Sequence, residues 1–312
     1  MAEREKYFSI LFQKLKKFDL LPNPKNIAQW RWDFQKYYRN SKIESHIFAD
    51  IWAEFGVGFE NIALVNCKKY TLLSKFFCNK TNILFLQTAV YFTLLGCIMD
   101  YLLDNGSIHQ KKTAQEKLSW EYAKDYFEDF KEAKSNSIID QLYAFVAKGF
   151  SDIYGYDLDK YYNLIEMVKN VIQAELYVVD TKTITFEYPM VMDKSILFIL
   201  IASEIALIES QKIGENSKIF YLIGEVFAWI DDACDIFEDM ENGQKNMVWY
   251  ELNKNNNMEI ILEKVVQTIY HHLELIKKYT NIEIYQFFLA ETQEWVFSCK
   301  ELREKIWNCE GE

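Results

Sequence analysis

Proline and glycine are scarce in this chain of 312 residues. The sequence has 3 prolines and 10 glycines, whereas globular proteins usually contain roughly 5% proline and 7% glycine. Tight turns depend on these two residues, so the shortage argues against an all-β fold and against many short elements. The composition therefore predicts long helices.

Cysteines at the Cys-x-x-Cys spacing of many zinc and redox sites are also missing. The segment Met1–Lys17 mixes charged and apolar residues and lacks the apolar core of a signal peptide. We therefore expect reduced thiols, no zinc site and a cytoplasmic protein. The six cysteines are Cys67, Cys78, Cys97, Cys234, Cys299 and Cys309.

Positively charged residues are fewer than negatively charged ones. The chain has 35 lysines and arginines and 46 aspartates and glutamates, which gives a net charge of −11. An acidic chain is a poor ligand for polyanions, so we expect no nucleic-acid partner. Apolar residues make up 50% of the chain and aromatic residues 16%. That content is enough for a large hydrophobic core and argues against general disorder.

No apolar segment of the sequence is long enough to span a membrane. The two strongest, Ile83–Met99 and Ser195–Ile208, fall below the roughly 20 apolar residues of a transmembrane helix. Each also contains polar residues, such as Thr93 in the first and Glu204 in the second. We predict that both are buried core helices and that the chain has no transmembrane segment.

Helical spacing of apolar residues continues through almost the whole chain. Asn23 is a suitable N-cap with Pro24 at the first helical position, and Thr181–Pro189 reads as a loop. The pattern predicts an all-α fold, with one domain of ten or more helices over residues 1–312. Predicted helices in the second half are 157–180, Met190–Ser210, Ser217–Glu241, Met258–Asn281 and Glu283–Trp307.

Two acidic clusters interrupt otherwise apolar helices. Asp231, Asp235 and Asp239, which we call the aspartate row, share one helix face at i, i+4 and i+8. Asp232 joins the same side, three residues before Asp235. Four aspartates at this spacing, directly after an apolar segment, are unusual for a solvated face.

The second cluster is smaller. Asp100 and Asp104, which we call the aspartate pair, lie at i and i+4 at the end of the apolar segment from Ile83. Such a pair is common on exposed helix faces, so a solvated face is the simpler interpretation of this cluster alone. Like charges at i, i+4 destabilise a helix by a few tenths of a kcal/mol, which suggests a bound cation at both clusters. Magnesium, which prefers oxygen ligands and often shares them with phosphates, is the expected ion.

The region from 190 to 250 resembles the second half of class I isoprenoid synthases. Lys194–Phe198 is similar to the Lys-Thr-x-x-Leu-Phe segment of prenyl diphosphate synthases, and Gly224–Asp239 is similar to their second aspartate-rich motif. Glu241–Asn246 is similar to the segment that follows this motif in squalene-synthase-like members. Residues 80 to 250 share the resemblance more loosely, and the aspartate pair takes the place of the first motif.

This resemblance implies a class I isoprenoid-synthase helical bundle and a Mg²⁺-dependent terpene synthase. Such an enzyme ionises an allylic prenyl diphosphate, releases diphosphate and yields a hydrocarbon or an alcohol. The implied catalytic residues are Asp100, Asp104, Asp231 and Asp235. The implied metal ligands are Asp100, Asp104, Asp231, Asp232, Asp235 and Asp239.

The resemblance also implies substrate contacts. Lys194 and Lys245 would bind the diphosphate, although surface salt bridges account for such lysines equally well. Residues one turn above each aspartate cluster would line the prenyl pocket, although ordinary helix packing explains each of them singly. The expected lining residues are Thr93, Gly96, Cys97, Gly224, Phe227 and Ala228.

Chain-elongating enzymes carry an Arg-Arg pair shortly after the first motif, and here that place reads Ile108–Lys112 without arginine. The sequence therefore favours a terpene synthase close to the non-plant type with two all-aspartate motifs. A prenyltransferase, condensing head-to-tail or head-to-head, is the alternative enzyme. A helical protein that binds without catalysis is the alternative from another class. The oligomeric state stays open, with a homodimer among the options.

Overall fold

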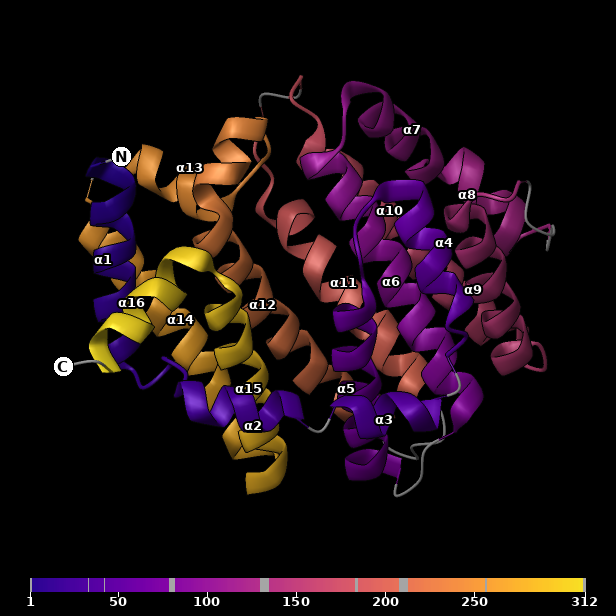
Figure 1. Cartoon of the computed structure of the whole chain (residues 1–312), viewed down its shortest axis with the longest axis horizontal. Coiled ribbons are helices and arrows are strands. Elements are labelled where there is room, and N and C mark those ends of the chain that lie inside the picture. Colours follow the sequence, from indigo (N-terminus) through magenta and orange to yellow (C-terminus); the bar gives the residue numbers. More distant parts are fainter. Residues whose placement is uncertain are drawn as a thin grey trace. The chain divides into compact units, whose positions relative to one another are not determined.

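The computed structural model describes residues 2–32, 34–41, 43–78, 82–129, 135–182, 185–207, 213–255 and 257–310. Within these ranges the protein has sixteen α-helices and no strand (Figure 1). The all-α prediction, with ten or more helices, is thus confirmed.

The chain divides into two compact units. The first unit comprises Met1–Trp30, Tyr177–Ile199 and Lys218–Glu312, and the second comprises Arg31–Leu176 and Leu200–Ser217. The single-domain arrangement that the sequence suggested is not confirmed, and each unit is described by itself below.

The second unit is organised around one long apolar helix, α6, which packs against α5, α7 and α9. A Cβ atom on Gly149 of α9 would lie 2.2 Å from the Oγ1 of Thr88 on α6, so glycine permits the close approach of these helices. The helices of this unit are α3 (Phe34–Ser41), α4 (His46–Phe55), α5 (Glu60–Cys78), α6 (Ile83–Asn105), α7 (Ile108–Leu118), α8 (Trp120–Phe127), α9 (Ile138–Tyr154) and most of α10 (Leu158–Val179).

Helix α6 is longer than predicted, because it continues past Met99 to Asn105 and reaches 23 residues. By length and composition it is the one helix among the described residues that could cross a membrane. In its most apolar window 61% of the residues are buried inside the protein, which agrees with the predicted core helix.

In the first unit, α1 packs against α14 and α16, and α14 also contacts α13 and α15. A Cβ atom on Gly224 of α12 would lie 2.7 Å from the Cα of Ile196 on α11, so these two helices cross very closely. The helices of this unit are α1 (Ala2–Lys17), most of α2 (Pro24–Trp32), the first part of α11 (Tyr188–Leu207), most of α12 (Ile213–Asn242), α13 (Met247–Lys254), α14 (Met258–Tyr279), α15 (Ile282–Ser298) and α16 (Lys300–Glu310).

Several predicted helix boundaries need correction. The single helix expected over Glu283–Trp307 is broken at Cys299, whose extended backbone (ψ 119°) separates α15 from α16. The helix expected from Met190 begins at Tyr188, and its last expected residues, 208–210, lie outside the described residues. The predicted start of α2 is correct, with the side chain of Asn23 accepting a hydrogen bond from the Lys25 N–H.

Candidate functional site

The aspartate row lies on the C-terminal half of α12, opposite a face that packs into the core. Ile230, Ala233 and Ile236 are buried, whereas Asp235 is exposed to solvent. Surrounding protein nonetheless reduces the hydration of the Asp235 carboxyl group, and Asp231 and Asp239 repel its charge. These effects, in that order, raise the pKa of Asp235 to about 9. The negative potential of the row therefore disfavours ionisation of Asp235 when no cation is bound.

Asp232 has a different environment from the row. Its side chain is buried, and its Oδ2 accepts a hydrogen bond of 2.5 Å from the Met247 N–H. Burial, followed by repulsion from Asp239, raises the pKa of Asp232 well above its usual value. The contact gives this carboxyl group a part in fixing the start of α13, and its role as a metal ligand stays a prediction.

Asn246 joins the aspartate row to α13 and is fully buried. Its Nδ2 donates to the backbone carbonyl of Asp232 and to the Oδ2 of Asp239, each at 2.7 Å. Its Oδ1 accepts from the Trp249 N–H at 2.9 Å and so caps the helix. The site prediction from sequence did not include Asn246. An asparagine directly before the apolar run Met247–Tyr250 was the available signal, since it marks an N-cap.

Lys245 contacts the end of α10. Its Nζ donates to the carbonyl of Tyr177 at 2.8 Å and to the carbonyl of Asp180, and it lies 4.4 Å from the centre of the Tyr177 ring. Loss of hydration lowers the pKa of Lys245. These contacts give the lysine a structural role at a helix C-terminus. The predicted diphosphate contact stays a prediction.

Lys194 lies on α11, two residues before Ile196, which packs against Gly224 of α12. It is half-buried, and its positive charge favours the ionised form of Asp232, although burial outweighs that effect. The close helix crossing thus brings the Lys194 segment beside the aspartate-bearing helix. Lys194–Phe198 and Gly224–Asp239 are therefore neighbours within one unit, and the third segment of the resemblance, Glu241–Asn246, contacts the second through Asn246.

The predicted pocket-lining residues of α12 are core residues. Gly224, Phe227 and Ala228 are all buried, and the Phe227 ring stacks on Trp295 with centroids 4.8 Å apart. Ala228 belongs to a hydrophobic cluster with Val178, Val191 and Met247. Helix packing accounts for all three, and their contact with a substrate stays a prediction.

The aspartate pair belongs to the second unit, where Asp100 and Asp104 are both half-buried on α6. Of the lining residues predicted nearby, Gly96 and Cys97 are half-buried, but Thr93 is buried. The Thr93 hydroxyl lies 2.9 Å from the Ala89 carbonyl and 2.8 Å from the Tyr70 hydroxyl. Thr93 is thus held within its own unit. Whether the pair faces the aspartate row stays a prediction, because the two clusters belong to different units.

A ready-made metal cluster is not found among the described residues, where no group of three or more His, Cys, Asp or Glu side chains is placed to hold an ion. Magnesium does not require one, since it is commonly bound through one or two carboxylates together with water and substrate phosphates. The carboxylate oxygens of the aspartate row match that preference.

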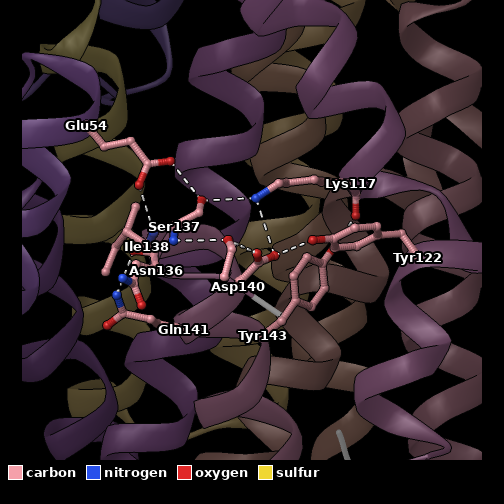
Figure 2. Close-up of polar contacts among 10 residues, drawn as sticks. Glu54, Lys117, Tyr122, Asn136, Ser137, Ile138, Asp140, Gln141 and Tyr143 are labelled. Carbon is pink, nitrogen blue, oxygen red and sulfur yellow. Dashed lines mark hydrogen bonds and ion pairs between the residues drawn. The ribbon is translucent and has the colours of Figure 1, made fainter. Parts of the chain in front are cut away.

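A polar network around the buried side chain of Asp140 in the second unit was not predicted (Figure 2). Asp140 accepts hydrogen bonds from the hydroxyl groups of Tyr122 and Ser135. It also forms an ion pair with Lys117, whose Nζ lies 3.3 Å from the Asp140 Oδ1. Burial opposes its ionisation, but these donors outweigh it and lower the pKa of Asp140. Glu54 of α4 accepts from the Ile138 N–H at 2.8 Å. The network fastens α4, α7 and α8 to the start of α9.

Comparison with protein-family models gives no matching family, and comparison with curated proteins gives no significant match. The function is therefore argued from the residues and contacts described above.

Proposed function

We propose that this protein is a Mg²⁺-dependent terpene synthase. It would ionise an allylic prenyl diphosphate, release the diphosphate and convert the remaining carbocation to a hydrocarbon or an alcohol. The observation that carries the proposal is the close crossing of α11 and α12 at Ile196 and Gly224, which brings the Lys194 segment beside the helix of the aspartate row.

The charges of this region support an anionic substrate that arrives with cations. A row of carboxylates repels a free diphosphate, so Asp231, Asp235 and Asp239 would hold Mg²⁺ between themselves and the substrate oxygens. Bound Mg²⁺ would supply Lewis-acid stabilisation of the charge that develops on the leaving diphosphate. Lys194 would add a fixed positive charge on the adjacent helix.

Buried neighbours would keep the row in place during turnover. Asn246 holds the carboxylate of Asp239, and the Met247 N–H holds the carboxylate of Asp232. Two of the four aspartates are thus fixed by the start of α13, while Asp235 stays exposed to solvent. A preorganised carboxylate row needs little rearrangement when the cation and substrate bind.

The test is an incubation with Mg²⁺ and geranyl, farnesyl or geranylgeranyl diphosphate, with free diphosphate and extracted products measured. We expect release of diphosphate with at least one substrate and loss of nearly all turnover in Asp235→Asn. Removing one metal-bearing carboxylate costs several kcal/mol of transition-state stabilisation. The matched control is Glu304→Gln, which neutralises an exposed carboxylate on α16 of the same unit.

Two results would contradict the proposal. One is the absence of diphosphate release with all three substrates in the folded wild-type protein, and the other is full turnover in EDTA. The aspartate pair of the second unit is tested in the same assay with Asp104→Asn, for which the resemblance implies a comparable loss.

A further inference from the structure

The chain leaves α12 by a turn that passes beside the end of α10. Gly243 directly follows α12 and has a φ of +71°, the left-handed conformation that glycine adopts readily. The Gln244 N–H donates to the Asp239 carbonyl at 2.8 Å and so caps the helix. A Cβ atom on Gly243 would lie 3.2 Å from the Cγ2 of Thr181, which places the turn against the residues that follow α10. We call Gly243–Met247 the anchor segment.

Lys245 fastens the anchor segment to the last turn of α10. Its N–H donates to the Val178 carbonyl at 3.1 Å, and its Nζ donates to the carbonyl of Tyr177 at 2.8 Å and to that of Asp180. Carbonyl groups at a helix C-terminus attract a cation, because they form the negative end of the helix dipole. The Tyr177 ring, 4.4 Å from the same Nζ, is itself fixed, since its hydroxyl donates to the Thr185 carbonyl at 2.7 Å. All of these residues belong to the first unit.

The next two residues of the anchor segment hold the helix of the aspartate row. Asn246 donates through its Nδ2 to the Asp232 carbonyl and to the Asp239 Oδ2, each at 2.7 Å. The Met247 N–H donates to the Oδ2 of Asp232. Neighbouring Cα atoms are only about 3.8 Å apart, so a shift of Lys245 is transmitted directly to these contacts. The carboxylate of Asp239 therefore depends on an attachment to the end of α10.

We propose that Lys245 is a positioning residue for Mg²⁺ binding by the aspartate row. This inference rests on the proposed function, in which the row holds Mg²⁺ between itself and the substrate. With the anchor segment in place, the Asp239 carboxylate keeps its orientation and needs little rearrangement to accept the ion. Without the contacts of Lys245, the repulsion between Asp239 and Asp235 favours other orientations. Lys245 thereby acts on the metal through Asn246.

The positive charge of Lys245 gives this proposal a distinctive sign. Removal of a positive charge near carboxylates by itself strengthens the binding of a cation, because like charges repel. Loss of positioning weakens binding instead, and loss of a residue that supports a metal ligand typically costs about 10- to 100-fold in metal affinity. We expect the lower end of that range, because Lys245 supports Asp239 through another residue.

The probe for the test is Mn²⁺, which sites with oxygen ligands accept in place of Mg²⁺ and whose free ion is measured by electron paramagnetic resonance. Substrate-free wild type and Lys245→Met are titrated at a temperature at which circular dichroism shows both to be folded. We expect the Kd for Mn²⁺ to rise about tenfold in Lys245→Met. A role in stability alone would lower the midpoint of thermal unfolding but leave this Kd unchanged, as would a contact with diphosphate alone. Lys245→Gln serves the same comparison if Lys245→Met does not fold.

The matched control is Lys254→Met in the same unit. Lys254 is exposed on α13 and lies 4.1 Å from the centre of the Tyr250 ring, so it shares a positive charge and an aromatic neighbour with Lys245. Its replacement should leave the Kd for Mn²⁺ unchanged or slightly lower. Unchanged or tighter binding in the folded Lys245 variant, or an equal weakening in Lys254→Met, would overturn the proposal.

A third variant separates this inference from the proposed function. If Asp235→Asn weakens Mn²⁺ binding and Lys245→Met does not, the metal site of the proposed function is supported and the role of Lys245 alone is wrong. Absence of Mn²⁺ binding in the wild type would overturn both.

Discussion

At the scale of single residues, Asp235 shows the effect of desolvation and of charge repulsion within the aspartate row on its pKa. Its pKa of about 9 lies far above the roughly 3.9 of an unfolded aspartate, so the native state binds the proton more tightly. For a carboxyl group with a raised pKa, the resulting stability is present at acidic pH and falls as the pH rises between these values. Metal-free protein should therefore lose stability from about pH 4 to about pH 9.

We predict that Asp235→Asn flattens this pH dependence and raises or maintains stability at pH 7 in EDTA. The neutral amide removes the repulsion from Asp231 and Asp239. Urea denaturation at several pH values measures the effect, with Glu304→Gln as the control that keeps the wild-type slope. A variant whose stability falls as steeply as that of the wild type would show that another group is responsible.

Asn246 supports the same region through its side chain. We predict that Asn246→Ala destabilises the protein by about 2–4 kcal/mol, because the change leaves buried partners on Asp232, Asp239 and Trp249 unsatisfied. Urea denaturation is the measurement.

The matched control is Asn257→Ala. Asn257 caps α14 by accepting from the Ile260 N–H, but it is exposed. Loss of an exposed cap of this kind costs about 1 kcal/mol. Equal losses in the two variants would mean that the contacts of Asn246 with the aspartates contribute nothing.

At the scale of secondary-structure elements, sequence periodicity located most helices but not their interruptions. The spacing of apolar residues continues smoothly through Cys299, yet the backbone there is extended and a new helix starts. No proline or glycine marks this break. Likewise, the contacts of Asp140 with Lys117 and Tyr122 join separate helices, which periodicity within one helix cannot reveal. The aspartate row was predictable because its members share one helix.

The crossing of α11 and α12 sets the place of Lys194 and permits a test at this scale. We predict that Gly224→Ala destabilises the protein by about 1–3 kcal/mol, because the new methyl group would lie 2.7 Å from the backbone Cα of Ile196. In Gly58→Ala, the nearest atom is the flexible carboxylate of Glu60, so this control should change stability little. Thermal and urea denaturation compare the two variants. Equal stability of Gly224→Ala and the wild type would contradict the close crossing.

At the scale of the whole molecule, composition alone predicted an all-helical chain. A chain with few turn-forming residues is poorly suited to the many short strands of an all-β fold. The division into two compact units could not be predicted in the same way. No linker rich in proline, glycine or serine separates them, and α10, α11 and α12 each contribute residues to both units. Composition marks a domain boundary where the chain finishes one unit before it starts the next. Here each unit is built from separate stretches of the chain, so no such boundary exists.

The last prediction concerns the number of substrates that the molecule accommodates. Chain elongation requires two diphosphates at once and hence two sets of cationic contacts. After the aspartate pair, Ser107 caps α7, and Lys112 on that helix lies 3.8 Å from Glu116. The positive charge of Lys112 is thus partly neutralised by a glutamate on its own helix. The Arg-Arg segment of elongating enzymes is also missing from this part of the sequence. We predict release of a hydrocarbon or alcohol from one prenyl diphosphate and no incorporation of radiolabelled isopentenyl diphosphate. Labelled product of greater length would favour the prenyltransferase instead. In that case Lys112→Ala should raise the KM for isopentenyl diphosphate while leaving the KM for the allylic substrate unchanged.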